Sequence, residues 1–117
     1  MATYNVIVTE SAERDLDELY ADVATHDSPS RADELLVHVM TVVARLQTLP
    51  ERGTVPPELR ELGVRDFHEV FFKPYRIIYR ILEPSSRSRS QGQVAILLIV
   101  DGRRDLQSVL ARRLLTR

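Results

Sequence analysis

Apolar and polar residues follow a strand pattern and then a helical pattern over the first 27 residues. Tyr4, Val6 and Val8 alternate with the residues between them, which predicts a short strand. Thr9 and Ser11 are of the type that caps helices, and acidic residues follow in the first turn. The next apolar positions form one stripe of an amphipathic helix and are Ala12, Leu16, Leu19, Tyr20 and Val23.

A second helical pattern starts at Ser28 and Pro29, which are favoured as an N-cap and as the first helical residue. Its apolar stripe ends before Pro50 and comprises Ala32, Leu35, Leu36, Val39, Val42, Val43, Leu46 and Leu49. Val37, Met40 and Ala44 widen the stripe beyond one face, which indicates a helix that is either sandwiched in the core or covered by a partner. We expect most of these residues to belong to the core and the extra face to be open to a partner. Because few residues join the two helices, we expect an antiparallel hairpin.

The pattern changes to the strand type after a loop rich in Pro and Gly at residues 51–63, which has room for one turn at 58–62. Residues 65–72 form one predicted strand, Lys73-Pro74 a tight turn, and residues 75–82 the next strand. Residues 84–92 are expected to be a flexible loop, and residues 94–100 a central strand. Gly102 ends that strand, and a short C-terminal helix follows with Leu106, Val109, Leu110 and Leu114 on its apolar side.

The resulting order of elements is β-α-α-β-β-β-α, which places the chain in the α+β class. We expect the N-terminal helical hairpin to pack on a mostly antiparallel sheet whose last three strands form a meander. A length of 117 residues with 44% apolar residues predicts one domain over residues 1–117.

Composition excludes several classes of protein. The chain has no cysteine, so disulfides, thiolate metal sites and cysteine nucleophiles are excluded. Its longest apolar run covers residues 94–100, far short of the roughly 20 residues that a spanning helix needs. The N-terminus lacks the pattern of a signal peptide. We therefore expect a soluble, cytoplasmic protein.

The formal net charge of −1 hides a strong asymmetry between the two halves. Residues 1–58 hold four arginines and eleven acids, a net charge of −7, whereas residues 59–117 hold eleven arginines, one lysine and six acids, a net charge of +6. Such a separation indicates that the C-terminal half meets an anionic partner, and the alternative is that arginine decorates solvated strands. The planar fork of arginine suits phosphate and carboxylate partners.

Several short motifs occur in a fixed order over nearly the whole chain. They are Tyr4-x-Val6-x-Val8-Thr9, Ala12-x-x-Asp15-Leu16, Leu49-Pro50-x-x-Gly53, Pro57-Glu58-Leu59, Leu62-Gly63, Tyr75-Arg76-Ile77-Ile78-Tyr79 and Gly102-Arg103-Arg104-Asp105-Leu106. Together they resemble the RelE/ParE superfamily of toxins from type II toxin–antitoxin systems. The resemblance implies a small toxin that a cognate antitoxin holds inactive by folding a C-terminal segment onto it.

The superfamily has two functional branches, and the resemblance leaves both open. RelE-like members cleave mRNA at the ribosome without a metal, whereas ParE-like members inhibit DNA gyrase. RNA cleavage needs a base for the ribose 2′-OH, an acid for the leaving oxygen, and cations around the transition state. Glu69 is the candidate base, and Arg76, Arg103 and Arg104 are the candidate phosphate clamp. Lys73 can contribute only if its turn bends inward.

This sequence departs from the RelE-like pattern at two places. RelE-like nucleases commonly carry basic residues on the strand before the Tyr-Arg motif, where this chain has Phe67 and Glu69. They also tend to carry a Tyr or a His-Tyr pair near the C-terminus, whereas residues 101–117 contain neither type. An arginine is a poor proton donor because it stays protonated. These departures favour the ParE-like branch, and an inactive interaction module is a third alternative.

Each candidate residue also has a purely structural interpretation. Arg76 can pair with Glu69 or Glu83 across the sheet, and Arg103 and Arg104 can neutralise the aspartates beside them or complement a helix terminus. His26 and His38 have no companions at the spacing of metal ligands, and we expect neither metal nor cofactor.

The leading hypothesis is a toxin that acts by binding. The predicted target-binding residues are Arg76, Arg103, Arg104, Arg112 and Arg113, with DNA gyrase as the target and the ribosome with its mRNA as the alternative. The predicted antitoxin-binding residues are Val37 and Met40, which an acidic and apolar segment would cover.

Overall fold

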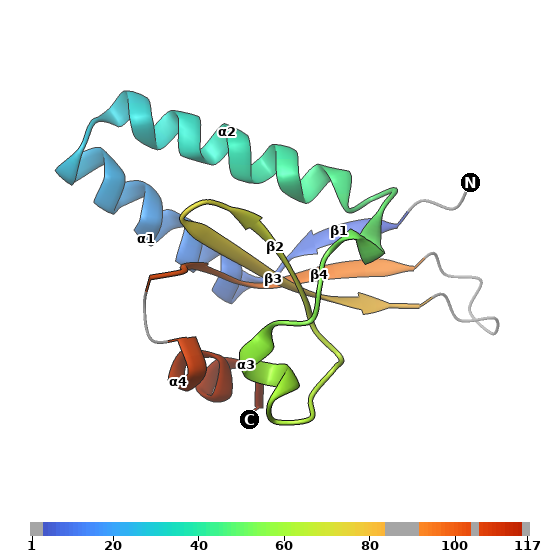
Figure 1. The fold of residues 1–117 in the computed structure, drawn as a ribbon. Helices are drawn as coiled ribbons and strands as arrows, with labels where there is room; N and C mark the ends of the chain where they lie inside the picture. Colours follow the sequence, from blue (N-terminus) through green and yellow to red (C-terminus); the bar gives the residue numbers. More distant parts are fainter. Residues whose placement is uncertain (1–3, 84–91, 104–105, 116–117) are drawn as a thin grey trace.

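The sheet of the computed structural model has four strands in the order β1-β4-β3-β2 (Figure 1). The strands are β1 (Asn5–Val8), β2 (His68–Phe72), β3 (Tyr75–Leu82) and β4 (Gln93–Asp101). β1 pairs with β4 in parallel, and the other neighbours are antiparallel, so the predicted meander is confirmed. The structure describes residues 4–83, 92–103 and 106–115, and the predicted loop at 84–92 therefore lies almost wholly outside the described residues.

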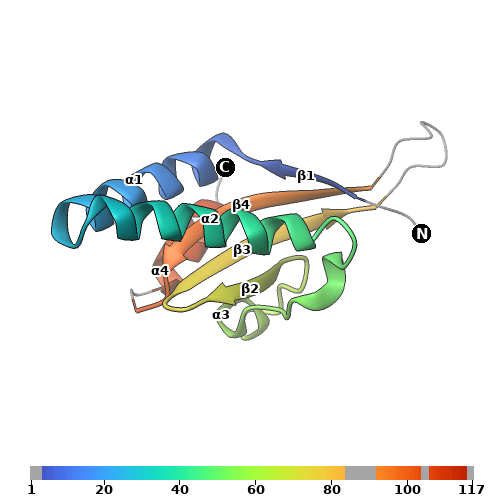
Figure 2. The same cartoon turned by 90° about the horizontal axis from the view of Figure 1, so that it is seen from above.

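Two long helices form the predicted hairpin and lie across one face of the sheet (Figure 2). They are α1 (Glu10–His26) and α2 (Pro29–Arg45). The Thr9 hydroxyl accepts a bond from the Ala12 N–H at 3.3 Å, and the Ser28 hydroxyl accepts one from the Arg31 N–H at 3.1 Å. Of the two candidates for the first cap, Thr9 is the N-cap, whereas Ser11 lies inside α1, and Ser28 caps α2 as predicted. Each cap supplies a partner to an otherwise unpaired amide of the first turn.

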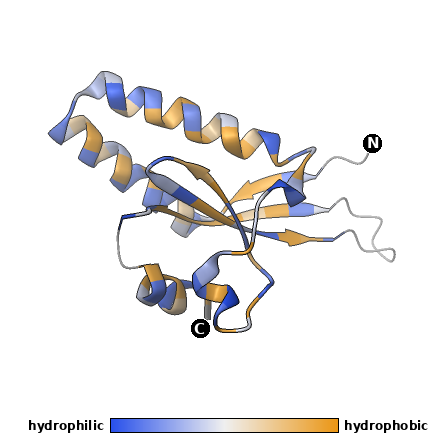
Figure 3. Ribbon diagram, viewed as in Figure 1, coloured by the Kyte–Doolittle hydropathy of each residue, from blue (hydrophilic) through white to orange (hydrophobic). Residues whose placement is uncertain are grey.

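The sheet has a separate apolar cluster on each face. The larger cluster, under the helical hairpin, is built around Leu16, Leu35, Val39, Val43, Leu46, Val70, Ile77, Tyr79, Val94 and Ile96. The smaller one lies under two short helices, α3 (Pro57–Arg60) and α4 (Leu106–Leu110), and contains Leu59, Phe67, Ile78, Leu98, Val100, Leu106 and Leu110. Burying a side chain of this size stabilises the fold by about 1.5–3 kcal/mol. Apolar residues dominate the strands and alternate with polar residues along the helices (Figure 3). The apolar side chains of the strands are divided between the two clusters, so both faces of the sheet are covered.

The structure corrects two predicted boundaries. The second helix ends at Arg45 rather than just before Pro50, because the chain turns through residues 46–48 into a 3-10 turn, η1 (Pro50–Arg52). The strand predicted for residues 65–72 begins at His68. The predicted C-terminal helix is present as α4, and it continues over Leu114 as a π-helical turn, η2 (Ala111–Leu115). Among the described residues, no helix is long and apolar enough to cross a membrane.

Tyr79 fixes the loop that follows α2. Its side chain is fully buried, and its hydroxyl donates to the Pro50 carbonyl at 2.6 Å and accepts from the Gly53 N–H at 3.1 Å. Burial raises the pKa of this hydroxyl, so it stays protonated and able to donate. The chain then runs antiparallel to the outer edge of β2, where Thr54 and Glu69 exchange two backbone bonds of 3.1 and 2.7 Å.

Candidate functional site

Arg76 is the centre of a charged cluster on the sheet face that carries α3 and α4. It lies on β3, opposite Phe71 of β2 and Val100 of β4. Its Nε donates to Glu69 at 2.6 Å, and its two terminal nitrogens donate to the two oxygens of Glu58 at 2.7 and 2.8 Å. Such fork-shaped pairing of a guanidinium with a carboxylate is among the stronger charged contacts in proteins.

The local sequence explains how both carboxylates reach this arginine. Glu69 lies on β2 beside β3, and its side chain is 1% exposed. Pro57 starts α3, and the buried Leu59 anchors α3 to the sheet, which directs Glu58 at the guanidinium. Hydrogen bonds from Arg76 hold the pKa of Glu58 below its usual value, and the same bonds raise the pKa of Arg76. The predicted pairing of Arg76 with Glu69 is observed.

A hollow of about 350 Å3 opens beside this cluster and brings together several predicted residues. Glu69, Lys73, Arg76 and Arg103 line it, together with Pro57, Phe71, Pro74 and Gly102. Lys73 lines it because the turn after β2 brings it there. Arg103 is largely exposed and donates to Asp101 at 2.6 and 2.9 Å. Arg104 lies outside the described residues.

The formal charges around this hollow cancel. Three cations are present, Lys73, Arg76 and Arg103, and three carboxylates either line the hollow or bind those cations, Glu58, Glu69 and Asp101. A cluster of zero net charge attracts a phosphate less strongly than a free set of cations. No histidine or tyrosine is among the described residues that line the hollow, so the usual proton donors for a leaving oxygen are lacking there.

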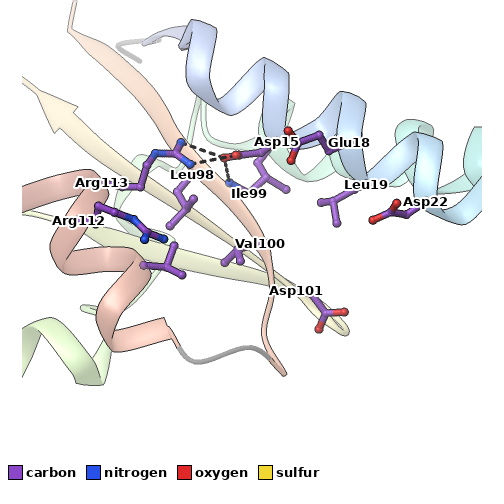
Figure 4. Close-up of a pocket in the computed structure, with 11 residues that line it drawn as sticks. Asp15, Glu18, Leu19, Asp22, Leu98, Ile99, Val100, Asp101, Arg112 and Arg113 are labelled. Atoms are coloured by element: carbon purple, nitrogen blue, oxygen red, sulfur yellow. Dashed lines mark hydrogen bonds and ion pairs between the residues drawn. The ribbon is translucent and has the colours of Figure 1, made fainter.

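Arg112 and Arg113 lie in a different hollow, between α1, β4 and the C-terminal helix (Figure 4). Arg113 donates to both oxygens of Asp15 at 3.0 and 3.1 Å and to the Leu97 carbonyl at 3.1 Å. Asp15 also accepts from the Ile99 N–H at 3.1 Å. The ion pair therefore joins the C-terminal helix to α1. Its two side chains also supply hydrogen-bond partners to the Leu97 carbonyl and the Ile99 N–H, on the edge of β4 beyond the end of β1.

The hollow around Arg113 carries more negative than positive charge. It measures about 290 Å3, and its charged lining consists of Asp15, Glu18, Asp22, Asp101, Arg112 and Arg113. The structure thus divides the predicted target-binding arginines over two hollows, and it engages Arg76 and Arg113 in ion pairs within the fold. Target binding by any of them stays a prediction.

Loss of the Asp15 side chain is expected to lower the free energy of unfolding by about 2–3 kcal/mol, since it leaves the Ile99 N–H and the Arg113 guanidinium without their partner. Urea denaturation of Asp15→Ala, Arg113→Ala and the double variant checks this. The cycle should give a coupling energy of about 1 kcal/mol, whereas strictly additive losses would show that the pair contributes nothing.

The predicted antitoxin-binding residues share one exposed face of α2. Val37 is 62% exposed and Met40 is 44% exposed. With Leu36, Thr41, Ala44 and Arg45 they line a wide, shallow hollow of about 630 Å3. The structure therefore brings these two residues together on an apolar surface that no described residue covers.

Two partners in these clusters were missed by sequence reasoning. Glu58 rather than Glu83 is the second partner of Arg76, and Glu83 instead accepts a bond from the Tyr4 hydroxyl at 3.1 Å. Asp15 is the partner of Arg113, 98 residues away. Both acids stand in motifs quoted above, but neither motif indicates which cation it meets. Within the described ranges, no group of three or more His, Cys, Asp or Glu side chains is placed to hold a metal ion.

Comparisons with known proteins agree with this architecture. A family model described as the ParE toxin of the type II toxin–antitoxin system parDE matches residues 6–106. A chain from the chromosomal ParDE toxin–antitoxin system of P. aeruginosa is similar in fold, with a TM-score of 0.64 and 19% identity over 85% of this chain and 96% of that one.

A chain from the toxin–antitoxin complex RelBE2 of Mycobacterium tuberculosis is also similar. It has a TM-score of 0.53 and 27% identity, over 86% of this chain and 93% of that one. No curated protein sequence matches significantly.

Proposed function

Since the chain belongs to the ParE toxin family of type II toxin–antitoxin systems, we propose that this toxin acts in the cytoplasm by binding and inhibiting DNA gyrase. In this proposal it does not cleave RNA. A cognate antitoxin neutralises it by covering the α2 face that presents Val37 and Met40.

The occupation of Arg76 by two carboxylates carries this proposal. Its Nε and both terminal nitrogens already donate to Glu69 and Glu58 at 2.6–2.8 Å. To bind this guanidinium, a phosphate would have to displace Glu58, which accepts two hydrogen bonds from it. Breaking that ion pair costs free energy, which RNA binding would have to offset. A second contact of Arg76, from its Nε at 2.6 Å, holds the carboxylate of Glu69, so the candidate base is already engaged in an ion pair within the fold.

The target-facing cations in this proposal are Arg103 and Arg112, because their side chains are exposed at the rims of the two hollows. Arg76 and Arg113 hold the surrounding elements in place through their ion pairs. Exposed arginines on such rims steer an anionic partner and contribute to specificity more than to raw affinity.

One observation favours the alternative, ribosome-dependent cleavage of mRNA. Lys73 lines the same hollow as Glu69, Arg76 and Arg103, so a lysine borders the hollow that contains the candidate base. A lysine there can act as a proton donor or stabilise a phosphorane-like transition state.

Induced expression of the toxin without its antitoxin separates the two activities. We expect growth to stop with induction of the DNA-damage response while total message stays intact, and we expect Lys73→Ala to remain as toxic as the wild type. Primer extension on several abundant messages and a damage-responsive reporter give the two readings. Cleaved messages that become intact in the Lys73→Ala strain would establish the nuclease instead, and unchanged growth would indicate an inactive interaction module.

A further inference from the structure

Phe71 has an exposed aromatic ring on the sheet face that carries α3 and α4. The ring is 57% exposed, and it lines the hollow of about 350 Å3 that also contains Arg103. The central carbon of the Arg76 guanidinium lies 5.7 Å from the ring centroid, which is the position of a cation–π contact. The ring is therefore held in place without being buried. We call this hollow the Phe71 hollow.

The walls of the Phe71 hollow are fixed by the fold. The Gly102 N–H donates to the Pro74 carbonyl at 2.7 Å, which ties the end of β4 to the turn after β2. Pro57 lines the hollow at the start of α3, whose next residue but one, Leu59, is buried under the sheet. A hollow whose shape exists before binding costs little conformational entropy to fill.

Positive charge dominates the part of this hollow that solvent reaches. Its two exposed cations are Lys73 and Arg103, and the side chain of Arg103 is 75% exposed. The three carboxylates of the charged cluster are each bound to an arginine, and their side chains are between 1% and 26% exposed. An incoming partner thus meets cations beside an apolar ring. This combination favours a partner that presents a carboxylate next to an apolar side chain.

Arg103 is better prepared than Lys73 to bind such a carboxylate. Its Nε and Nη2 donate to Asp101 at 2.9 and 2.6 Å, which orders the guanidinium, whereas its Nη1 has no hydrogen-bond partner among the described residues. Lys73 forms no ion pair or side-chain hydrogen bond within the described ranges. Its flexible side chain would lose more conformational entropy on binding, so we expect Arg103 to contribute more than Lys73.

A segment of protein fits the Phe71 hollow better than a nucleic acid does. Duplex DNA carries one negative charge for about every 1.7 Å of its axis, so it would extend well beyond two exposed cations. The hollow around Arg113 begins one residue before Gly102 along β4, and its lining includes the carboxylates of Glu18, Asp22 and Asp101. These carboxylates would repel a polyanion that continued in that direction.

We infer that the Phe71 hollow is the surface through which this toxin binds its target. A segment of the target protein places an apolar side chain against Phe71 and pairs a carboxylate with Arg103. The inference rests on the proposed function, in which the target is DNA gyrase. It adds which face of the toxin binds and what the target has to present.

Binding of toxin variants to purified DNA gyrase tests this. We expect Phe71→Ala to bind about 30-fold more weakly than the wild type, and Arg103→Ala about 10-fold more weakly. Leu49→Ala and Arg80→Ala are the matched controls, because Leu49 is 58% exposed and Arg80 is an exposed cation, and both lie outside the hollow. We expect each control to bind within about three-fold of the wild type.

Thiol protection gives a second reading that needs no change at Phe71 or Arg103. The chain has no cysteine, so Lys73→Cys places one thiol on the rim of the hollow, and Arg80→Cys places one outside it. With gyrase bound, a maleimide should modify Lys73→Cys about ten-fold more slowly than in the free toxin, because an interface excludes solvent. Modification of Arg80→Cys should not change. The mass of the toxin reports the extent of reaction.

The outcomes separate this inference from the proposed function. Wild-type toxin that does not bind gyrase would overturn both. Wild-type binding with equal affinities for Phe71→Ala and Leu49→Ala, and with no protection of Lys73→Cys, would overturn the inference alone. Protection of Lys73→Cys by a mixed-sequence DNA or RNA oligonucleotide without gyrase would also overturn it, because the occupant would be a nucleic acid. Protection that rises with the concentration of free toxin would do the same in favour of a second copy.

Discussion

Gly53→Ala is expected to lower the free energy of unfolding by about 2–4 kcal/mol. A Cβ at this position would lie 2.4 Å from the Glu69 carbonyl oxygen and 2.6 Å from the Tyr79 hydroxyl, so backbone or a buried ring has to move. That movement breaks the bond from the Gly53 N–H to Tyr79 and weakens the pairing of Thr54 with β2. Urea denaturation followed by circular dichroism measures the loss.

Gly63→Ala is the matched control, because Gly63 has a positive φ of 77° but nothing within 4 Å of an added Cβ. Only backbone strain acts there, so a loss of about 1 kcal/mol is expected. A loss at Gly53 no larger than that at Gly63 would show that the loop after α2 is not clamped between Tyr79 and β2.

Removing the Arg76 guanidinium is the second change with a large expected effect. In Arg76→Met the carboxylate of Glu69 stays in a site where its side chain is 1% exposed, and it has lost its cation. Breaking a buried ion pair from one side costs about 3–5 kcal/mol, and we expect a loss of that size near pH 7. Loss of toxicity in such a variant would then reflect unfolding, so it cannot by itself identify Arg76 as a phosphate clamp.

At acid pH, the difference in the free energy of unfolding between the wild type and Arg76→Met should become smaller. Because the fold lowers the pKa of Glu58, its contribution to stability is present above the unfolded value of about 4.3 and disappears as the pH falls through the lower folded value. Denaturation at several pH values between about 3 and 7 checks this. Arg14→Met, which disturbs a solvent-exposed pair with Glu10, should stay within about 0.5 kcal/mol of wild type at every pH. If Arg76→Met also stayed within about 0.5 kcal/mol of wild type at every pH, the ion pairs of Arg76 would not stabilise the fold.

Local signals in the sequence were enough to predict most of the fold. The caps at Thr9 and Ser28 depend on neighbours three residues away, and the alternation along β3 depends only on which residues face each apolar cluster. These features are visible in a short window of sequence. The end of α2 was missed because Leu46 and Leu49 continue the apolar spacing although the chain has already turned toward Pro50.

The candidate site was less predictable because its contacts join distant residues. Glu58 lies on the four-residue helix α3 and binds Arg76, which is 18 residues further along the chain. Asp15 binds Arg113, which is 98 residues away. Neither the charge asymmetry nor the motifs indicate which cations are already paired inside the fold. The predicted target-binding arginines lie in two separate hollows because β4 and the C-terminal helix place them there. These positions depend on the tertiary structure and cannot be predicted from local sequence.

Supercoiling of relaxed plasmid by purified DNA gyrase tests the central claim most directly. Folded toxin should inhibit the reaction in a dose-dependent way, its purified antitoxin should restore supercoiling, and the same toxin should leave ribosome-bound mRNA uncut. Supercoiling that proceeds at the uninhibited rate with toxin in large excess, beside mRNA that is cleaved at the ribosome, would contradict it.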